Sequence, residues 1–154
     1  MSMPAAETYL PEGLPAPGLG ATDCAAPFWA GLAQRRLLVQ RCPVCATWQA
    51  GAEWICHACH AFDPVWTEVV ARGRVHSWER VWQASHPLLR ERVPYLVVLV
   101  ELAEARPARL VGNLLGDALQ PVRIGMAVQG VFEQHLQGDR AYGLLQWRAM
   151  EESE

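Results

Sequence analysis

Four cysteines arranged as two close pairs constrain this chain more than any other feature. Their spacing is Cys42-x2-Cys45-x10-Cys56-x2-Cys59. A tetrahedral zinc ion binds four thiolates at about 2.3 Å, and a tight turn within each pair directs two sulfurs to one point. Two such turns facing each other complete the ligand shell. The pattern therefore predicts a rubredoxin-like zinc ribbon over residues 38–66, with one structural zinc held by these four cysteines.

The same cysteines admit other interpretations. A thioredoxin-type pair would be redox-active, but it requires a βαβ context and no second pair. Iron can occupy the same four thiolates, and the sequence leaves this alternative open. The string from Cys56 to His60 matches the c-type haem motif C-x-x-C-H, which leaves the first pair unexplained. His57 and His60 are interpreted as exposed loop residues, with a ligand role as the alternative, and Cys24 as a buried thiol.

A ribbon of this size has almost no hydrophobic core, so the free energy of binding zinc is largely free energy of folding. The sequence contains no run of about 20 apolar residues, so we expect no membrane span. The N-terminal stretch has no basic start and is interrupted by prolines, so we expect no secretory signal. A cytoplasmic location follows, in which closely spaced cysteines bind metal more often than they form disulfides.

The segments before the ribbon have different characters. Residues 1–23 are rich in proline and glycine and predict an irregular arm, either a solvated tail or a strap on a partner protein. A short helix is predicted over residues 25–36, with Asp23 as its cap. Phe28 and Trp29 are large for so short a helix, so we expect them to dock onto the ribbon or onto another chain.

After the ribbon the hydrophobic pattern changes to period two. Strands are predicted at residues 74–82, 95–102, 109–115, 127–133 and 141–148, separated by turn signals. Five short strands without a long helix predict a small barrel of the OB type. We therefore expect a mostly β chain with an arm (1–23), a helix and zinc ribbon (24–68), an OB-fold domain (69–148) and an acidic tail (149–154).

The first predicted barrel strand and the loop after it have the composition of a ligand site. Strand alternation places two sets of side chains on opposite faces. Arginine pairs bidentately with phosphate, and tryptophan offers a flat face to an adenine ring. A place in the core or in a protein interface is the alternative for the tryptophans. The predicted face consists of His76, Trp78, Arg80 and Trp82, with Arg90 and Arg92 from the loop and Val75 and Val81 on the opposite side.

Charge and motifs limit the classes of function. Residues 72–148 carry ten arginines against seven acidic residues, a balance of +3 in a chain whose net charge is −3. This surplus suits an anionic ligand but is small for nucleic acid, so a single-stranded nucleic-acid binder remains an alternative only. The absence of lysine excludes Schiff-base chemistry. The sequence contains no G-x-S-x-G, no glycine-rich phosphate loop and no H-E-x-x-H. A stand-alone acyl-CoA hydrolase is therefore the least favoured of the functions considered.

The order of several strings resembles a known family. These strings are Phe28-Trp29, Arg36-Leu37, Gln40-Arg41-Cys42-x2-Cys45, Cys56-x2-Cys59, Gly73-Arg74-Val75-x-Ser77-Trp78, Pro94-Tyr95-x-Val97-x-Leu99-Val100-Glu101-Leu102, Gly112-Asn113-Leu114, Ile124-Gly125-Met126-x-Val128 and Val131-Phe132. Over residues 26–135 the chain resembles the zinc-ribbon, OB-fold proteins called acyl-CoA-associated, the domain of unknown function numbered thirty-five.

This resemblance implies a role as a companion subunit. Members of this family resemble companion subunits of thiolase-superfamily enzymes. The enzymes that they accompany include archaeal acetoacetyl-CoA thiolases with hydroxymethylglutaryl-CoA synthases, lipid-transfer-protein-type steroid side-chain aldolases, and bacterial acyltransferases. The partner then holds the catalytic residues, and this chain, no enzyme by itself, helps to bind or enclose an acyl-CoA shared by the hetero-oligomer. The family turns commonly read C-P-x-C-G. Here Ala46 and His60 replace the glycines and His57 replaces the second proline, so the left-handed turn is less favourable.

Overall fold

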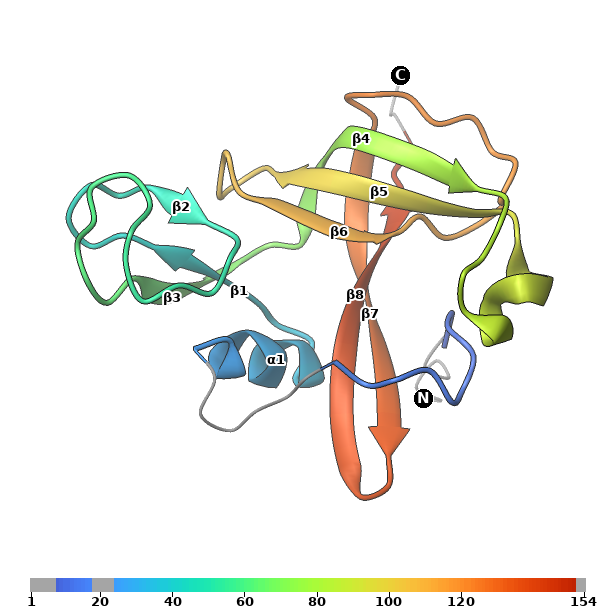
Figure 1. The fold of residues 1–154 in the computed structure, drawn as a ribbon. Coiled ribbons are helices and arrows are strands. Elements are labelled where there is room, and N and C mark those ends of the chain that lie inside the picture. The colour runs from blue at the N-terminus through green and yellow to red at the C-terminus, as the bar shows by residue number, and fades with distance from the viewer. Residues whose placement is uncertain (1–7, 18–23, 152–154) are drawn as a thin grey trace, which may run out of the picture.

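The computed structural model describes residues 8–17 and 24–151 and contains a small and a larger antiparallel sheet (Figure 1). The small sheet has the order β2-β1-β3, and the larger sheet has the order β6-β5-β4-β7-β8. One helix, α1, precedes them, and a 3-10 helix, η1, that the sequence did not predict joins β4 to β5. The elements are α1 (Ala26–Ala33), β1 (Leu37–Arg41), β2 (Trp48–Gln49), β3 (Val65–Val69), β4 (Arg72–Val81), η1 (Pro87–Arg92), β5 (Tyr95–Leu102), β6 (Arg109–Asn113), β7 (Ala127–Gln137) and β8 (Arg140–Ala149).

Helix α1 is shorter than the predicted helix over residues 25–36. Arg35 takes a left-handed conformation with φ 59°, and the Arg36 N–H donates back to the Gly31 carbonyl at 2.8 Å. This arrangement ends a helix and turns the chain toward the next element. The predicted cap Asp23 lies outside the described residues. No helix of the described residues has the length and apolar character needed to cross a bilayer.

The larger sheet closes into the predicted OB barrel. Each predicted strand is present, although β7 and β8 extend beyond their predicted ends. Closure is made where the end of β6 meets β8: Leu114 forms a parallel bridge with Trp147, and the Leu115 N–H donates to the Trp147 carbonyl at 2.7 Å. The Trp147 side chain is fully buried at this seam. The prediction of a mostly β chain with a short helix and an OB fold is therefore confirmed.

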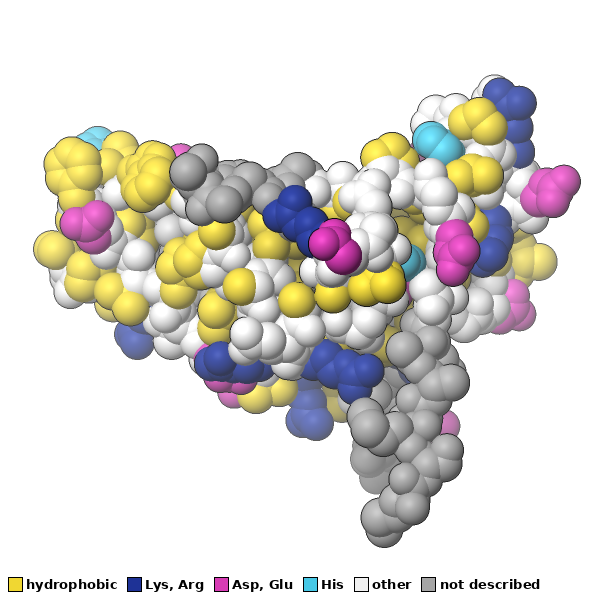
Figure 2. Space-filling model, turned by 90° about the horizontal axis from the view of Figure 1, so that it is seen from below, with side chains coloured by type: hydrophobic (Ala, Val, Ile, Leu, Met, Phe, Trp, Pro, Cys, Tyr) yellow, Lys and Arg dark blue, Asp and Glu magenta, His cyan; other side chains and the backbone are white. Residues whose placement is uncertain are grey.

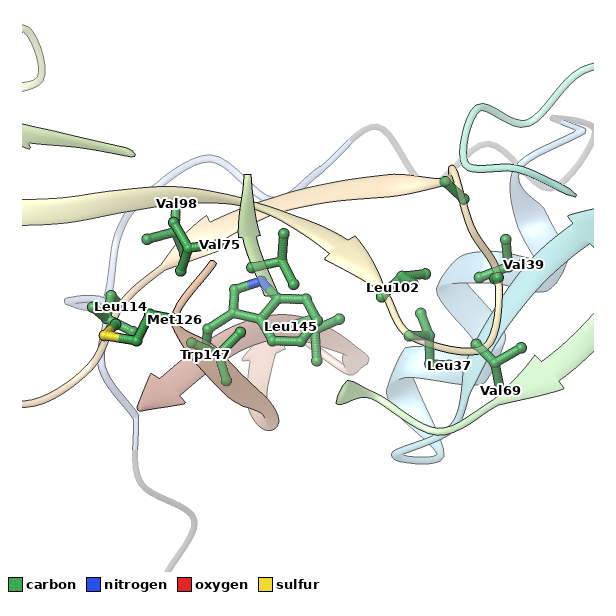
Figure 3. Packing of buried hydrophobic residues seen from close by; sticks show 14 of the residues in the cluster. Leu37, Val39, Val69, Val75, Val98, Leu102, Leu114, Met126, Leu145 and Trp147 are labelled. Carbon is green, nitrogen blue, oxygen red and sulfur yellow. The ribbon is translucent and has the colours of Figure 1, made fainter. Parts of the chain in front are cut away.

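One hydrophobic core joins the base of the ribbon to the barrel (Figure 3). Leu37 and Val39 of β1 and Val69 of β3 are buried in the same cluster as the barrel residues Leu102 and Trp147. The expectation of an almost coreless ribbon therefore holds only for its outer part. Because the small sheet shares its apolar residues with the barrel, its orientation relative to the barrel is fixed by packing.

The long hairpin of β7 and β8 holds helix α1. β7 pairs with β4 only over residues 127–129, but it pairs with β8 along nearly its whole length. At Gly143 of β8 the backbone of α1 lies so close that an added Cβ would be 2.5 Å from the Leu32 carbonyl carbon and closer still to the oxygen. Gln134 Nε2 also donates to the Leu32 carbonyl at 3.1 Å. Glycine at position 143 thus determines how closely α1 packs.

We expect Gly143→Ala to lower the free energy of unfolding by about 1–3 kcal/mol, because the added methyl group overpacks a backbone contact. Chemical denaturation of the metal-loaded protein measures this difference. The control is Gly51→Ala, where an added Cβ meets only the Glu53 side chain at 3.7 Å or more. The control should change stability by less than about 0.5 kcal/mol. Equal stabilities of the two variants would contradict the packing described for α1.

Candidate metal centre and docking surfaces

Each cysteine pair lies in a turn with the same backbone hydrogen bonds. The Ala46 N–H donates to the Cys42 carbonyl at 3.0 Å, and the His60 N–H donates to the Cys56 carbonyl at 2.9 Å. Ala46 has φ 62° and His60 has φ 61°. Both non-glycine residues therefore occupy the left-handed region expected where the family commonly has glycine. The hydrogen bonds and the sulfurs hold each turn in this less favourable conformation.

The two turns bring the four sulfurs together as predicted. All four Sγ atoms lie within 4.8 Å of one another. The Cys42–Cys59 and Cys45–Cys56 Sγ distances are 3.5 and 3.6 Å. Zinc–sulfur bonds of about 2.3 Å in a tetrahedron require sulfurs about 3.8 Å apart. The cluster therefore has the dimensions of a four-thiolate metal site.

Hydrogen bonds and neighbouring sulfurs set the ionisation of these thiols. The Cys45 N–H lowers the pKa of Cys42, and hydrogen bonds from Thr47 lower the pKa of Cys45 to about 6. At Cys59 the Ala61 N–H lowers the pKa, but burial and the other three thiols outweigh it and raise the pKa to about 11. A bound cation offsets this accumulating negative charge, so it favours the thiolate at all four positions.

The donor set restricts which ions fit. Four thiolates suit zinc or iron and do not suit magnesium or calcium, which prefer oxygen. His57 and His60 are exposed, as expected for loop residues. Cys24 lies apart from the cluster, is partly rather than fully buried, and directs its Sγ to the Ala52 carbonyl at 2.9 Å. The residues therefore could hold one metal ion by sulfur alone.

Two polar residues beside the cluster were missed at the sequence level. Gln40 and Gln49 are only 3% and 4% exposed, and their side chains hydrogen-bond to each other and to residues 53–57. The available signal was a glutamine two residues before Cys42, directly after the apolar run Leu37–Val39. A buried polar side chain there requires hydrogen-bond partners, and the second cysteine turn supplies them.

The predicted aromatic and cationic face is partly wrong. A β-bulge between Val75 and Ser77 makes His76 an extra residue, so that Val75 pairs with Val100 and Trp78 pairs with Val98. Directly opposed residues lie on the same side of a sheet. The bulge thus places Trp78 on the same side as Val75 and separates it from His76, because an inserted residue reverses the alternation beyond it.

Arg80 is used within the chain. Its Nε donates to the Ala118 carbonyl at 2.9 Å and its Nη2 to the Gln120 carbonyl at 2.8 Å. Its guanidinium also lies over the Trp78 ring, 5.5 Å from the centroid. This arginine therefore fastens the loop between β6 and β7 to β4, and it has fewer donors left for a phosphate than the sequence suggested.

Arg92 fastens part of the N-terminal arm. Its Nη1 donates to the Tyr9 carbonyl at 3.0 Å, and the next residue, Leu10, donates its N–H to Glu133 Oε1 at 2.6 Å. Glu133 is 1% exposed and also contacts His135 Nε2 at 2.9 Å. Residues 8–17 therefore lie on the barrel of their own chain. The rest of the arm lies outside the described residues. Of the predicted ligand residues, Arg80 is partly buried and the others are exposed; Trp82 follows β4 and Arg90 lies in η1.

An apolar groove of about 480 Å³ lies between α1 and the strands β6 and β8 of the barrel. Phe28 and Trp29 form one wall, with their ring centroids 5.1 Å apart in an edge-to-face arrangement. The residues that line the groove carry no charge. Its apolar lining includes Phe28, Trp29, Leu110, Val111, Leu144 and Leu145. The two aromatics predicted to dock thus pack partly on the core and partly border this groove.

A second apolar surface lies on the outer part of the ribbon. Figure 2 shows hydrophobic side chains gathered at the end of the molecule that the ribbon forms, on the left of the view. Trp54 and Phe62 are 64% and 73% exposed, and Val44 is 74% exposed beside Cys45. Exposed apolar groups that gather in this way are typical of protein interaction sites.

Comparisons with known proteins agree with this architecture. A family model described as the C-terminal OB-fold domain of ChsH2 matches residues 66–133. The chain is 40% identical over 102 residues to a probable enoyl-CoA hydratase alpha subunit from Thermomonospora curvata, covering 66% of this chain and 31% of that protein. It is 27% identical over 110 residues to a DUF35 domain-containing scaffold protein from Methanocaldococcus jannaschii, covering 69% and 74% of the two chains. The chain thus spans about a third of the first of these relatives.

Solved structures show the same fold. A structure titled Ltp2-ChsH2(DUF35) aldolase matches with a TM-score of 0.68 and 32% identity, covering 87% of this chain and 98% of that one. A DUF35 protein of unknown function from Sulfolobus solfataricus matches with a TM-score of 0.58 and 14% identity, covering 84% and 87%. The second likeness is one of fold alone.

Removing the metal with a chelator should expose the amides of residues 42–62 to hydrogen exchange, because the cluster closes this part of the ribbon. The amides of β1 and β3 should stay protected, since their side chains lie in the barrel core. Hydrogen exchange measured with and without chelator distinguishes the two regions. Unchanged protection of the Ala46 and His60 amides after complete metal removal would contradict a metal-dependent ribbon.

Proposed function

Because the chain belongs to the DUF35 OB-fold family, we propose that it is an accessory subunit of a thiolase-type enzyme whose partner subunit holds the catalytic residues. The observation that carries this proposal is the likeness to the Ltp2-ChsH2(DUF35) aldolase, at 32% identity over 98% of that chain. The scaffold name of the Methanocaldococcus relative also supports a binding role. The partner is a thiolase, an acyltransferase or a lipid-transfer-protein-type aldolase.

The partner docks on the groove beside α1. This surface is apolar and uncharged, and it contains the exposed edge residue Val111 and the aromatic pair Phe28 and Trp29. Buried aromatic anchors contribute most of the energy of protein interfaces. The backbone contact at Gly143 holds α1 rigidly, so the groove is formed before the partner arrives and the cost of ordering it on binding is small.

The ion in the ribbon is a structural zinc held by the four cysteines. It keeps the outer ribbon folded, and thereby presents Val44, Trp54 and Phe62 as a second contact surface for the partner. Zinc supplies no redox chemistry, and four protein ligands close its coordination shell, which suits a structural role.

The chain also contributes to acyl-CoA binding, at a smaller site than the sequence suggested. Trp82 and Arg90 lie in the exposed loop after β4 and supply a flat aromatic face and a free guanidinium. These groups suit the adenine and phosphates of CoA. Arg80 and Arg92 support the loops around this site through their carbonyl contacts.

Affinity capture from the source cells tests the docking proposal. The tagged chain should retain a thiolase-superfamily polypeptide, identified by mass spectrometry. Val111→Arg places a charge in the apolar groove and should lower recovery of that polypeptide at least about tenfold, since desolvating an unpaired charge is costly. The control is Leu119→Arg, which changes a leucine that is similarly exposed but does not line the groove. This variant should recover as much of the polypeptide as the unchanged chain. Recovery of the chain without a thiolase-superfamily protein would refute the proposed function.

Steady-state kinetics of the complex tests the CoA contact. Arg90→Ala should raise KM for the acyl-CoA about tenfold with kcat unchanged, because a charge-assisted hydrogen bond contributes about 1.5–3 kcal/mol and acts in binding rather than in chemistry. Arg72→Ala removes an exposed arginine at the other end of β4 and should leave KM unchanged. Equal KM values for the Arg90 variant and the unchanged complex would place the CoA head group elsewhere.

A further inference from the structure

Two buried glutamines connect the β1–β2 hairpin to the second cysteine turn. Gln40 and Gln49 lie directly opposite each other across the two strands. Gln49 Nε2 donates to Gln40 Oε1 at 3.1 Å. Primary amides removed from water require partners for both the nitrogen and the oxygen. The remaining side-chain partners of this pair lie in residues 53–57, the segment that leads into the second pair of cysteines.

Gln40 holds the start of that segment. Its Nε2 donates to the Glu53 carbonyl at 3.0 Å, and its Oε1 accepts the Glu53 N–H at 3.0 Å. The side-chain amide therefore pairs with the backbone of Glu53 as a neighbouring strand would. With the bond from Gln49, both lone pairs of the Gln40 oxygen are used.

Gln49 holds the segment at the metal centre itself. Its Nε2 donates to the Ile55 carbonyl at 3.2 Å, and its Oε1 accepts the N–H of His57 at 3.3 Å. These two backbone groups flank Cys56 on either side. The orientation of Cys56 is thus determined by an amide that belongs to the strand after the first cysteine pair.

The other links within this loop do not connect it to the hairpin. The Ile55–Phe62 bridge and the Asp63 N–H bond to the Trp54 carbonyl join parts of the same loop. Across the interface between the two turns, the structure has the sulfurs at one end and the glutamine amides at the other. None of these hydrogen bonds involves a sulfur, so the glutamine contacts are separate from the four thiols that could hold a metal ion.

We propose that Gln40 and Gln49 are positioning residues for the metal centre. They hold the second cysteine turn close enough to the first for the four sulfurs to converge. Less of the free energy of metal binding is then used to order the loop that carries the second cysteine pair. Groups that orient metal ligands from outside the coordination shell typically change metal affinity about 10- to 100-fold when they are replaced. The inference concerns the metal centre and does not depend on the proposed partner.

Metal affinity of the full chain tests this inference. Gln49→Met keeps the side-chain volume but removes the contacts to Ile55 and His57, and Gln40→Met removes those to Glu53. Competition between each variant and a chromophoric chelator gives Kd for zinc. Each variant should bind zinc about 10- to 100-fold more weakly. Cobalt bound to each variant should show weaker tetrahedral absorption than in the unchanged chain.

Val39→Ala is the matched control. Val39 precedes Gln40 in β1 and is 1% exposed, but its side chain packs in the barrel core and not on the cysteine turns. It should lower thermal stability while leaving the zinc Kd and the cobalt spectrum unchanged. Unaltered affinity in both glutamine variants would overturn the proposal. An equal loss of affinity in Val39→Ala, or collapse of the barrel NMR signals in both glutamine variants, would show a general structural role and would also overturn it.

Discussion

The convergence of four cysteine sulfurs on one point is the constraint on which the rest of the ribbon depends. The two turns hold residues in the left-handed region at Ala46 and His60, and the loop beyond β1 and β3 contributes little to the shared core. Burial and the three neighbouring thiols outweigh the Ala61 N–H and raise the pKa of Cys59 to about 11. A cation held by the four sulfurs would relieve this charge repulsion and close the loop in one step. The glutamine amides contact the backbone on both sides of Cys56.

The base of the ribbon has a different physical basis. Leu37, Val39 and Val69 are buried with the barrel residues, so the direction in which the ribbon projects is set by hydrophobic packing and not by the metal. Helix α1 is fixed in turn by the backbone contact at Gly143. The ribbon end and the groove beside α1 are thereby held in a fixed arrangement by packing, which suits the two-surface docking that we propose.

Local patterns allowed much of the fold to be predicted from the sequence. The spacing of the cysteines identified both turns, and period-two alternation identified all five barrel strands, because each signal is contained within a short segment. The bulge at His76 was not predictable in this way. It depends on how β4 fits β5 in the closed barrel, and it invalidated the alternation from which the ligand face was derived. The end of α1 was placed too late because Arg35 adopts a conformation that usually marks glycine.

The missed functional details have a common cause. Arg80 and Arg92 were interpreted as ligand groups because arginine binds phosphate, but their donors reach carbonyls of residues distant in sequence. No structural role was predicted for Gln40 and Gln49, because their partners also become neighbours only after folding. In each case the residue type was informative, whereas its partner was set by tertiary structure. The groove at α1 likewise combines residues from both ends of the chain.

Native mass spectrometry of the assembly isolated from the source cells reports the bound metal and the partner in one measurement. We expect a complex in which each copy of this chain carries one zinc ion and is bound to a thiolase-superfamily subunit. A metal-free chain found alone, with no such subunit attached, would contradict this expectation.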